Sequence, residues 1–239
     1  MYPAPMRRIV PAAVSILVVL VATSWAAGAS SSPGSADGVA SPSVRPSGTT
    51  PAGLASPVPM TPAGLLLWPA PPNPMELTIA AGLTPERAES LAHHVHSGLL
   101  IFKDGERVAV PAGIGIDIAN PGVMSFPDPV GTGYGGIEGC DVPCISPLHT
   151  HGWFGVLHTE SATPVPNRLG QFFVEWGVRL DAACVGEFCA PETPIAIAVD
   201  GDPFTGDPAT IELTDRRLIT IVIGTPPAVM PTSFDFEQP

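Results

Sequence analysis

The sequence predicts a mainly β protein: a single β-sandwich or barrel-like domain with one or two short helices, preceded by a disordered stalk rich in proline and serine. Short apolar runs separated by turn residues dominate residues 76–227, which is typical of strands. The chain's 31 prolines and 25 glycines oppose a helical bundle, because both residues disfavour helix interiors. The formal net charge of −12 excludes a nucleic-acid binder that works by neutralising phosphates.

Residues 76–227 have the length of one ordinary domain. Asp104-Gly105 lies between two apolar runs and predicts a hairpin, because glycine tolerates positive φ. Asp200-Gly201 repeats this pattern. The predicted strands are residues 99–102, 107–110, 195–199, 211–213 and 218–223.

Helix patterns are few. Thr84-Pro85-Glu86 has the form of an N-cap, a proline at the first helical position and an acid in the first turn. It predicts a helix that ends near Leu91. Residues 169–176 are predicted as a second short helix. The Gly- and Pro-rich connection 120–147 is expected to be an ordered loop across one end of the sheet.

The N-terminus predicts export. Arg7 and Arg8 precede the apolar run 10–22, and Ala27-Gly28-Ala29 supplies a small-residue cleavage site. We therefore assign 1–29 to a signal peptide and expect a secreted or extracytoplasmic protein. An uncleaved anchor that holds the chain at the membrane is the alternative, because the apolar run approaches spanning length.

Residues 30–75 form a predicted linker, and residues 228–239 a C-terminal tail. Eleven prolines fall between Pro33 and Pro74, and no apolar periodicity is present. Such a segment buries too little surface to offset its ordering entropy. Residues 65–68 are its one apolar patch, which we consider a candidate for docking on the domain.

Four cysteines in an exported chain favour disulfides over thiolate ligation of a metal. The spacing favours two local pairs, Cys140–Cys144 and Cys184–Cys189. A crossed arrangement that links the two loops remains open.

The six histidines carry the strongest chemical pattern, because all of them lie between residues 93 and 158. Two pairs have the form His-x-His: His94 with His96, and His149 with His151. Residues i and i+2 of a strand share a face, so each pair can present two imidazoles to one ion. His93 is expected on the opposite face from His94.

The second pair belongs to a predicted hairpin with its tip at Trp153-Phe154. In-register pairing would set His149 opposite His158, and cross-strand partners share a face. His149, His151, His158 and Glu160 then point the same way and make a transition-metal site. A one-residue bulge would break this arrangement. Since Trp-Phe supplies no positive φ, the flanking glycines would have to carry the turn. His94 and His96 on a neighbouring strand would add ligands or a second metal.

The motif order resembles that of a family of uncharacterised exported bacterial proteins, many of them actinobacterial. The motifs are HxH-x-x-L-x-I-F, C-x-x-x-L-H-T-H, G-V-L-H-T-E-S and L-G-Q-F-F-x-x-W-G-V. The resemblance covers nearly the whole predicted domain and implies Cys144 as a further ligand. Family members carry Asp where this chain has Gly152. The pattern is also loosely similar to that of cupins, whose motif spacing is not met.

Three functions fit these observations. The first is an exported metal-binding protein that captures copper or zinc through His149, His151 and His158, with His94, His96 and Glu160. The second is a metal-dependent enzyme, a cupin-like oxygenase or a hydrolase, although no nucleophile elbow, H-E-x-x-H helix or P-loop is present. The third is a cell-envelope interaction domain with structural histidines. A metal ion is the expected partner and nucleic acid is not, and the oligomeric state stays open.

Overall fold

The computed structural model describes residues 60–237. The predicted signal peptide and most of the predicted linker lie outside the described residues. Within the described range, no helix is long and apolar enough to cross a membrane.

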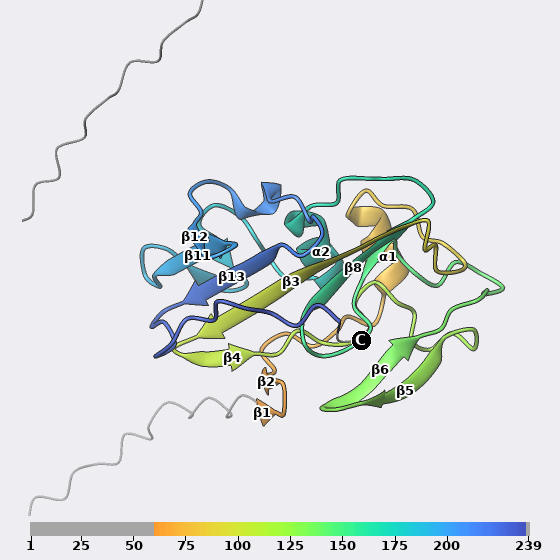
Figure 1. Ribbon diagram of the computed structural model, residues 1–239, viewed down its shortest axis with the longest axis horizontal. Helices are drawn as coiled ribbons and strands as arrows, with labels where there is room; N and C mark the ends of the chain where they lie inside the picture. The colour runs from red at the N-terminus through yellow and green to blue at the C-terminus, as the bar shows by residue number, and fades with distance from the viewer. Residues whose placement is uncertain (1–59, 238–239) are drawn as a thin grey trace, which may run out of the picture. The chain divides into compact units, whose positions relative to one another are not determined.

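The central element is β3 (His93–Lys103), the longest strand described (Figure 1). The N-terminal half of β3 pairs antiparallel with β8 (Val156–Ser161), which also pairs with β7 (Leu148–His149). The C-terminal half pairs antiparallel with β4 (Glu106–Val108) and parallel with β13 (Leu218–Ile223). These pairings bring His94 and His96 beside the strand that carries His158 and Glu160.

Short strands extend this sheet on both sides. Among the described residues, the two edges of the sheet do not pair with each other, so the sheet is open and forms no closed barrel. The prediction of a mainly β class with one or two short helices is therefore confirmed. Beyond β13 lie β11 (Ile195–Val199) and β12 (Asp202–Pro203), and beyond β4 lie β2 (Gly64–Leu65) and β1 (Met60–Thr61).

The two faces of β3 differ in what covers them. Leu99 and Ile101 point into the main core and pack with residues of α2 (Leu169–Trp176). Leu100 and Phe102 point to the other face, where they cluster with Phe236 near the C-terminus. Since side chains alternate along a strand, His94 and His96 belong to this second face, away from α2.

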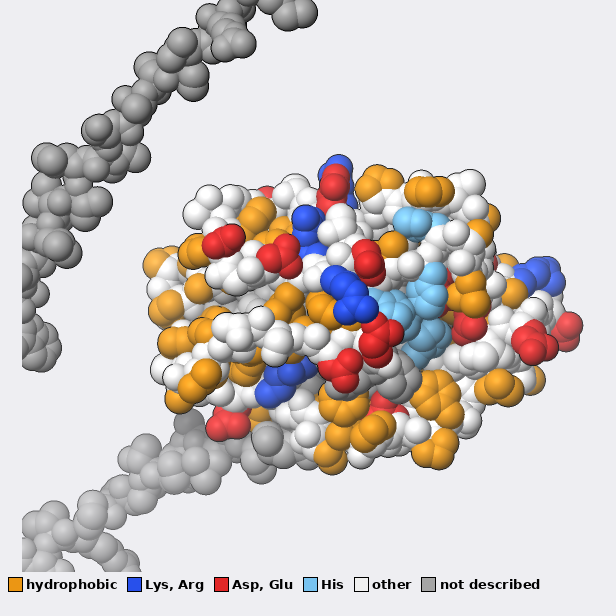
Figure 2. Space-filling view, in the orientation of Figure 1, with side chains coloured by type: hydrophobic (Ala, Val, Ile, Leu, Met, Phe, Trp, Pro, Cys, Tyr) orange, Lys and Arg blue, Asp and Glu red, His pale blue; other side chains and the backbone are white. Residues whose placement is uncertain are grey.

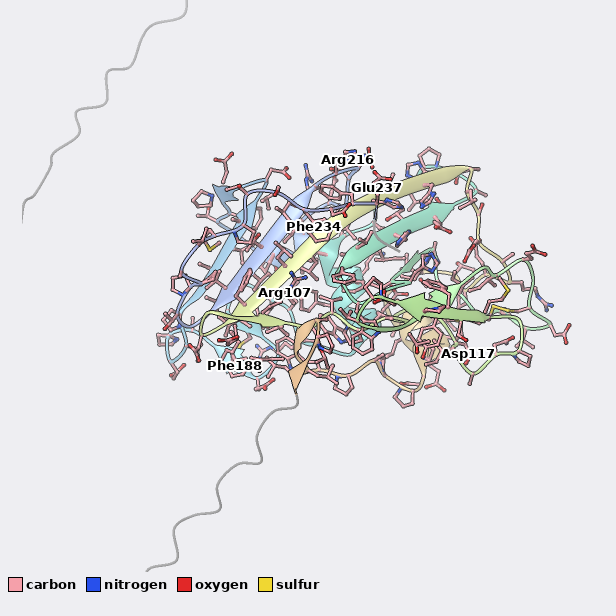
Figure 3. All side chains as sticks on the ribbon, turned by 60° about the horizontal axis from the view of Figure 1, so that its bottom comes forward. Arg107, Asp117, Phe188, Arg216, Phe234 and Glu237 are labelled. Carbon is pink, nitrogen blue, oxygen red and sulfur yellow. A yellow bond between two sulfur atoms is a disulfide. The ribbon has the colours of Figure 1, made fainter. Side chains whose placement is uncertain are left out.

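A C-terminal segment crosses the second face in front of β3 and β13 (Figure 1). Phe234 packs against the cluster formed by Leu100 and Phe102. A Cβ atom added to Gly98 would lie 2.8 Å from the Phe234 ring, so glycine is what allows this close approach. Arg216 pairs with Glu237 beside it (Figure 3).

The predicted helix ending near Leu91 is wrong. The backbone N–H of Glu86 donates to the carbonyl of Ile145 at 2.7 Å, and the two residues form a β-bridge. This long-range pairing outweighs the local N-cap pattern. The first helix is instead α1 (Pro74–Ala80), whereas the predicted helix 169–176 is confirmed as α2.

Two other segments also differ from their predictions. The expected strand 211–213 is reduced to one bridge between Arg168 and Glu212, next to a 3-10 turn at Pro208–Thr210. The connection 120–147 contains a separate hairpin, formed by β5 (Met124–Asp128) and β6 (Gly131–Gly135). This hairpin flanks the site described below.

The segment 60–75, predicted as the end of the linker, contributes β1, β2 and the start of α1 to the fold. The candidate patch at residues 65–68 docks as expected. Leu67 and Trp68 pack against the main core, and Trp176 Nε1 donates to the Trp68 carbonyl at 3.0 Å. The described fold therefore begins before residue 76.

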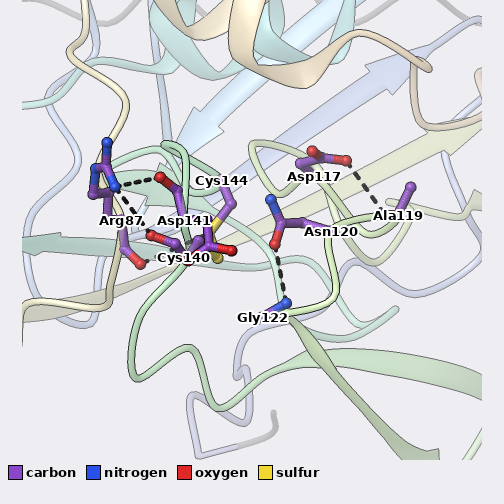
Figure 4. The surroundings of a disulfide bond; sticks show 8 residues. All are labelled: Arg87, Asp117, Ala119, Asn120, Gly122, Cys140, Asp141 and Cys144. Atoms are coloured by element: carbon purple, nitrogen blue, oxygen red, sulfur yellow. Dashed lines mark hydrogen bonds between the residues drawn. A yellow bond between two sulfur atoms is a disulfide. The ribbon is translucent and has the colours of Figure 1, made fainter.

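Both favoured disulfides form: Cys140 bonds to Cys144 (Figure 4), and Cys184 bonds to Cys189. The second pair joins β9 (Cys184–Val185) to β10 (Phe188–Cys189). Arg87 donates to the Cys140 and Asp141 carbonyls beside the first disulfide. A disulfide-bonded sulfur offers no thiolate, so the expectation of Cys144 as a metal ligand is wrong.

Candidate metal centre

The histidines form two rows across neighbouring strands on the second face of β3. His149 of β7 pairs with His158 of β8, which pairs with His96 of β3. In the next row Glu160 pairs with His94. The predicted hairpin register, His149 opposite His158, is confirmed, and no bulge interrupts β8.

Four of these side chains converge on one buried point. One donor atom each of His149, His151, His158 and Glu160 lies within 4.8 Å of the other three. Glu160 Oε1 is 3.9 Å from His149 Nε2, 3.8 Å from His151 Nε2 and 3.6 Å from His158 Nδ1. The two Nε2 atoms of His149 and His151 are 3.2 Å apart. We refer to these four residues as the buried set.

Backbone carbonyls fix the two imidazoles that come from the β7 side. His149 Nδ1 lies 2.8 Å from the Ser146 carbonyl, and His151 Nδ1 lies 2.6 Å from the Tyr134 carbonyl. A carbonyl only accepts, so each Nδ1 carries a proton, and in the neutral imidazole the Nε2 atom is left with a lone pair that an ion can bind. This is the arrangement in which metal-binding histidines are oriented by a second hydrogen bond.

Hairpin β5–β6 provides the carbonyl that holds His151. Tyr134 N–H donates in return to the His151 carbonyl at 3.0 Å. A Cβ atom at the neighbouring Gly135 would lie 2.8 Å from His151 Nδ1. Glycine at this position therefore lets the imidazole reach the backbone of β6.

Burial controls the protonation of the site. Burial lowers the pKa of His149 well below its ordinary value and lowers the pKa of His158 to about 4. Burial also acts to lower the pKa of His151, but the Glu160 carboxylate, the Tyr134 carbonyl and the Glu89 charge outweigh it and raise that pKa. Two of the three imidazoles are therefore neutral, as metal ligation requires, throughout the neutral range.

Burial likewise acts to raise the pKa of Glu160, but the imidazoles of His151 and His158 outweigh it and hold that pKa well below the usual range. The carboxylate is therefore ionised although only 3% of Glu160 is exposed. Its Oε2 atom and the Nε2 atom of His158 are buried and have no hydrogen-bond partner among the described residues. Neither atom belongs to the contact by which the two residues converge, which joins Glu160 Oε1 to His158 Nδ1.

A second set lies beside the first and consists of His94, His96 and His158, again with one donor atom each within 4.8 Å of the others. His94 Nε2 is 2.8 Å from His96 Nε2 and 3.4 Å from His158 Nδ1. The His94 side chain is 36% exposed, and histidines gather at one place on this face beside acidic side chains (Figure 2). We refer to His94 and His96 as the outer pair.

His93 belongs to neither set. It pairs with Ser161 and lines a shallow groove with Val95 and Pro164. Its position on the opposite face from His94 agrees with the strand alternation.

The turn between His151 and β8 contains a glycine with positive φ, as predicted, because Gly155 has a φ of 79°. Trp153 and Phe154 are both partly buried. Trp153 Nε1 donates to the Thr132 carbonyl of β6 at 3.0 Å. The tip of the hairpin thus packs onto β5–β6 and holds that hairpin near His151.

Sequence reasoning missed the groups that orient the ligands. The Ser146 and Tyr134 carbonyls belong to the backbone, and no residue type marks them. Glu89 acts on His151 from a segment that was predicted to be helical. The position of Glu89, a few residues before the histidine-rich strand β3, was the only sequence pattern that indicated a role for this carboxylate.

No family model, curated protein or solved structure matches the chain. The resemblance to exported bacterial proteins therefore stays a prediction, and the function is argued from the site itself.

Proposed function

We propose that this chain is an exported metal-binding protein that captures a copper or zinc ion through His149, His151, His158 and Glu160. One observation carries the proposal. Three imidazole nitrogens and a carboxylate oxygen meet at a buried point, and backbone carbonyls hold the Nδ1 side of two of the imidazoles, so that their Nε2 atoms face the site.

The donor set supports a transition metal. Imidazole suits zinc and copper, whereas magnesium and calcium prefer sites made of oxygen atoms. Tetrahedral zinc bonds of about 2.0–2.1 Å place neighbouring donor atoms about 3.3 Å apart. The three separations from Glu160 Oε1 are 3.6–3.9 Å, so shifts of a few tenths of an ångström would close the site around an ion.

The charge of the site also supports cation capture. Once the ion has displaced the proton of His151, three neutral imidazoles and one carboxylate leave a divalent ion with one net positive charge in a buried place. The acidic chain, with a net charge of −12, attracts cations at long range. Export agrees with the two disulfides, since such bonds persist in oxidising compartments.

The test is metal analysis of full-length protein purified without a histidine tag, followed by titration with Zn²⁺ and Cu²⁺ alone. We expect bound metal and a rise in unfolding temperature on titration, because a ligand that binds only the folded state stabilises it. His149→Ala and His158→Ala should lose the high-affinity ion. His93→Ala is the matched control, since it removes a histidine from the same sheet outside both sets.

Failure of Zn²⁺ and Cu²⁺ to bind the folded wild-type protein would overturn the proposal. Equal loss of metal in His93→Ala and His158→Ala would overturn the assigned residues. Because both substituted ligands are buried, near-UV circular dichroism of each metal-free variant must first show native packing. His158→Gln, which keeps a polar side chain, is the second variant for a His158→Ala protein that fails to fold.

A further inference from the structure

We infer that the site holds two ions: one in the buried set and a second, solvent-facing ion on His94 and His96, with the Glu160 carboxylate bridging the two. This inference rests on the proposed function and extends it from a mononuclear to a dinuclear centre. The second ion would be of the same chemical class, a divalent transition metal that imidazole binds.

The first argument is the geometry of the donor atoms. Five imidazoles and one carboxylate line the site, but their donor atoms do not form one group. They form two sets, which have only His158 in common, and each set lies within 4.8 Å. A zinc site is almost always four-coordinate, so a single ion in the buried set leaves His94 and His96 without a role.

The second argument is the position of Glu160 between the two sets. Its Oε1 atom is 3.2 Å from His94 Nε2, and also within 3.9 Å of His149 Nε2 and His151 Nε2. Its Oε2 atom is buried and has no hydrogen-bond partner among the described residues. A carboxylate oxygen has more than one lone pair, so Oε1, which faces donor atoms of both sets, can contact an ion in each.

The third argument is the charge around the outer pair. Two cations that share one carboxylate repel each other, and further negative charge lowers that cost. The carboxylates of Glu237 and Asp215 act on His96, and the backbone of Phe236 hydrogen-bonds to it. Because Arg216 pairs with Glu237, the charge of Glu237 is partly offset, and Asp215 in the turn before β13 is the second acidic group that acts on the outer pair.

The two positions differ in access. His149 is fully buried, whereas the His94 side chain is 36% exposed. A second ion would therefore face solvent and exchange faster than the first. The outer position would take up or release metal, or hold a water molecule, while the inner ion stays in place.

The experiment is a titration of metal-free wild-type protein with Zn²⁺, read by metal analysis after desalting and by calorimetry. We expect two ions per chain in the wild type and one in the His94→Ala/His96→Ala double variant. His93→Ala, the control, should keep both. One ion per chain in the wild type, or two in the double variant, would overturn the inference and leave the buried site standing. No bound ion in the wild type would instead overturn the proposed function.

The bridge has its own readout. Two Cu²⁺ ions that share a carboxylate couple magnetically, so the paramagnetic resonance signal of the doubly loaded protein should be weaker than that of two isolated ions. The double variant should return the full signal of one ion. Two Cu²⁺ ions with independent signals in the wild type would overturn the shared carboxylate.

Discussion

Replacing Glu175 by glutamine tests how burial controls the protonation of a carboxyl group in α2. Glu175 lies in α2 and is fully buried. Thr78 Oγ1 donates to its Oε1 atom at 2.9 Å, and its Oε2 atom has no partner among the described residues. Burial raises the pKa of Glu175 to about 8, although hydrogen bonds from Ser146 and Thr78 oppose the rise.

The magnitude follows from this shift. A carboxyl with a raised pKa contributes stability that is fully present below its ordinary value of 4.5 and is lost as pH rises through about 8. Between pH 4.5 and pH 7 the wild type should therefore lose roughly 3 kcal/mol of unfolding free energy through Glu175, at about 1.4 kcal/mol per pH unit. Glu175→Gln does not titrate and lacks this loss. Any cost of burying the extra amide is independent of pH and cancels in the comparison.

The assay is urea unfolding of metal-free wild type and Glu175→Gln at pH 4.5, 6 and 7. The difference in stability between the two proteins should shift in favour of the variant by roughly 3 kcal/mol over this range. Because His158 titrates in both proteins, its contribution cancels. Parallel stability curves across the pH range would refute the reasoning about Glu175.

Three further predictions concern ion binding and packing. Only His151 has a raised pKa in the buried set, so binding of an ion at pH 6 should displace about one proton. Calorimetry in two buffers of different ionisation enthalpy measures the number of protons released. Release of three protons would contradict the burial argument. Gly98→Ala should displace the Phe234 ring from the sheet and lower the free energy of unfolding by about 1–3 kcal/mol. Proteolysis of the C-terminal segment should then be faster. An unchanged cleavage rate would contradict the contact between Gly98 and Phe234. Converting Cys140 and Cys144 to serine should lower stability by about 2 kcal/mol, the value for so short a loop, measured by urea unfolding; no change would contradict a formed disulfide.

Local patterns in the sequence predict part of the site. Alternation along a strand places His94 and His96 on one face, and hairpin register places His149 opposite His158. The first follows from the two-residue period of a strand and the second from the short loop of a hairpin. The structure confirms both predictions.

The remaining features depend on long-range contacts. The pairing of β3 with β8 joins residues more than 50 positions apart, and no local pattern selects it. His151 lies beyond the end of β7, where the Tyr134 carbonyl orients it rather than strand geometry. Hairpin β5–β6 was missed because Pro127 and the glycines at 131, 133 and 135 are types that strands seldom contain.

X-ray absorption spectroscopy of the zinc-loaded His94→Ala/His96→Ala protein tests the buried set most directly, because it counts the ligands of a single ion. We expect three imidazoles and one carboxylate oxygen at about 2.0–2.1 Å. A first shell of water oxygens with one imidazole or none would contradict capture of the ion by His149, His151 and His158.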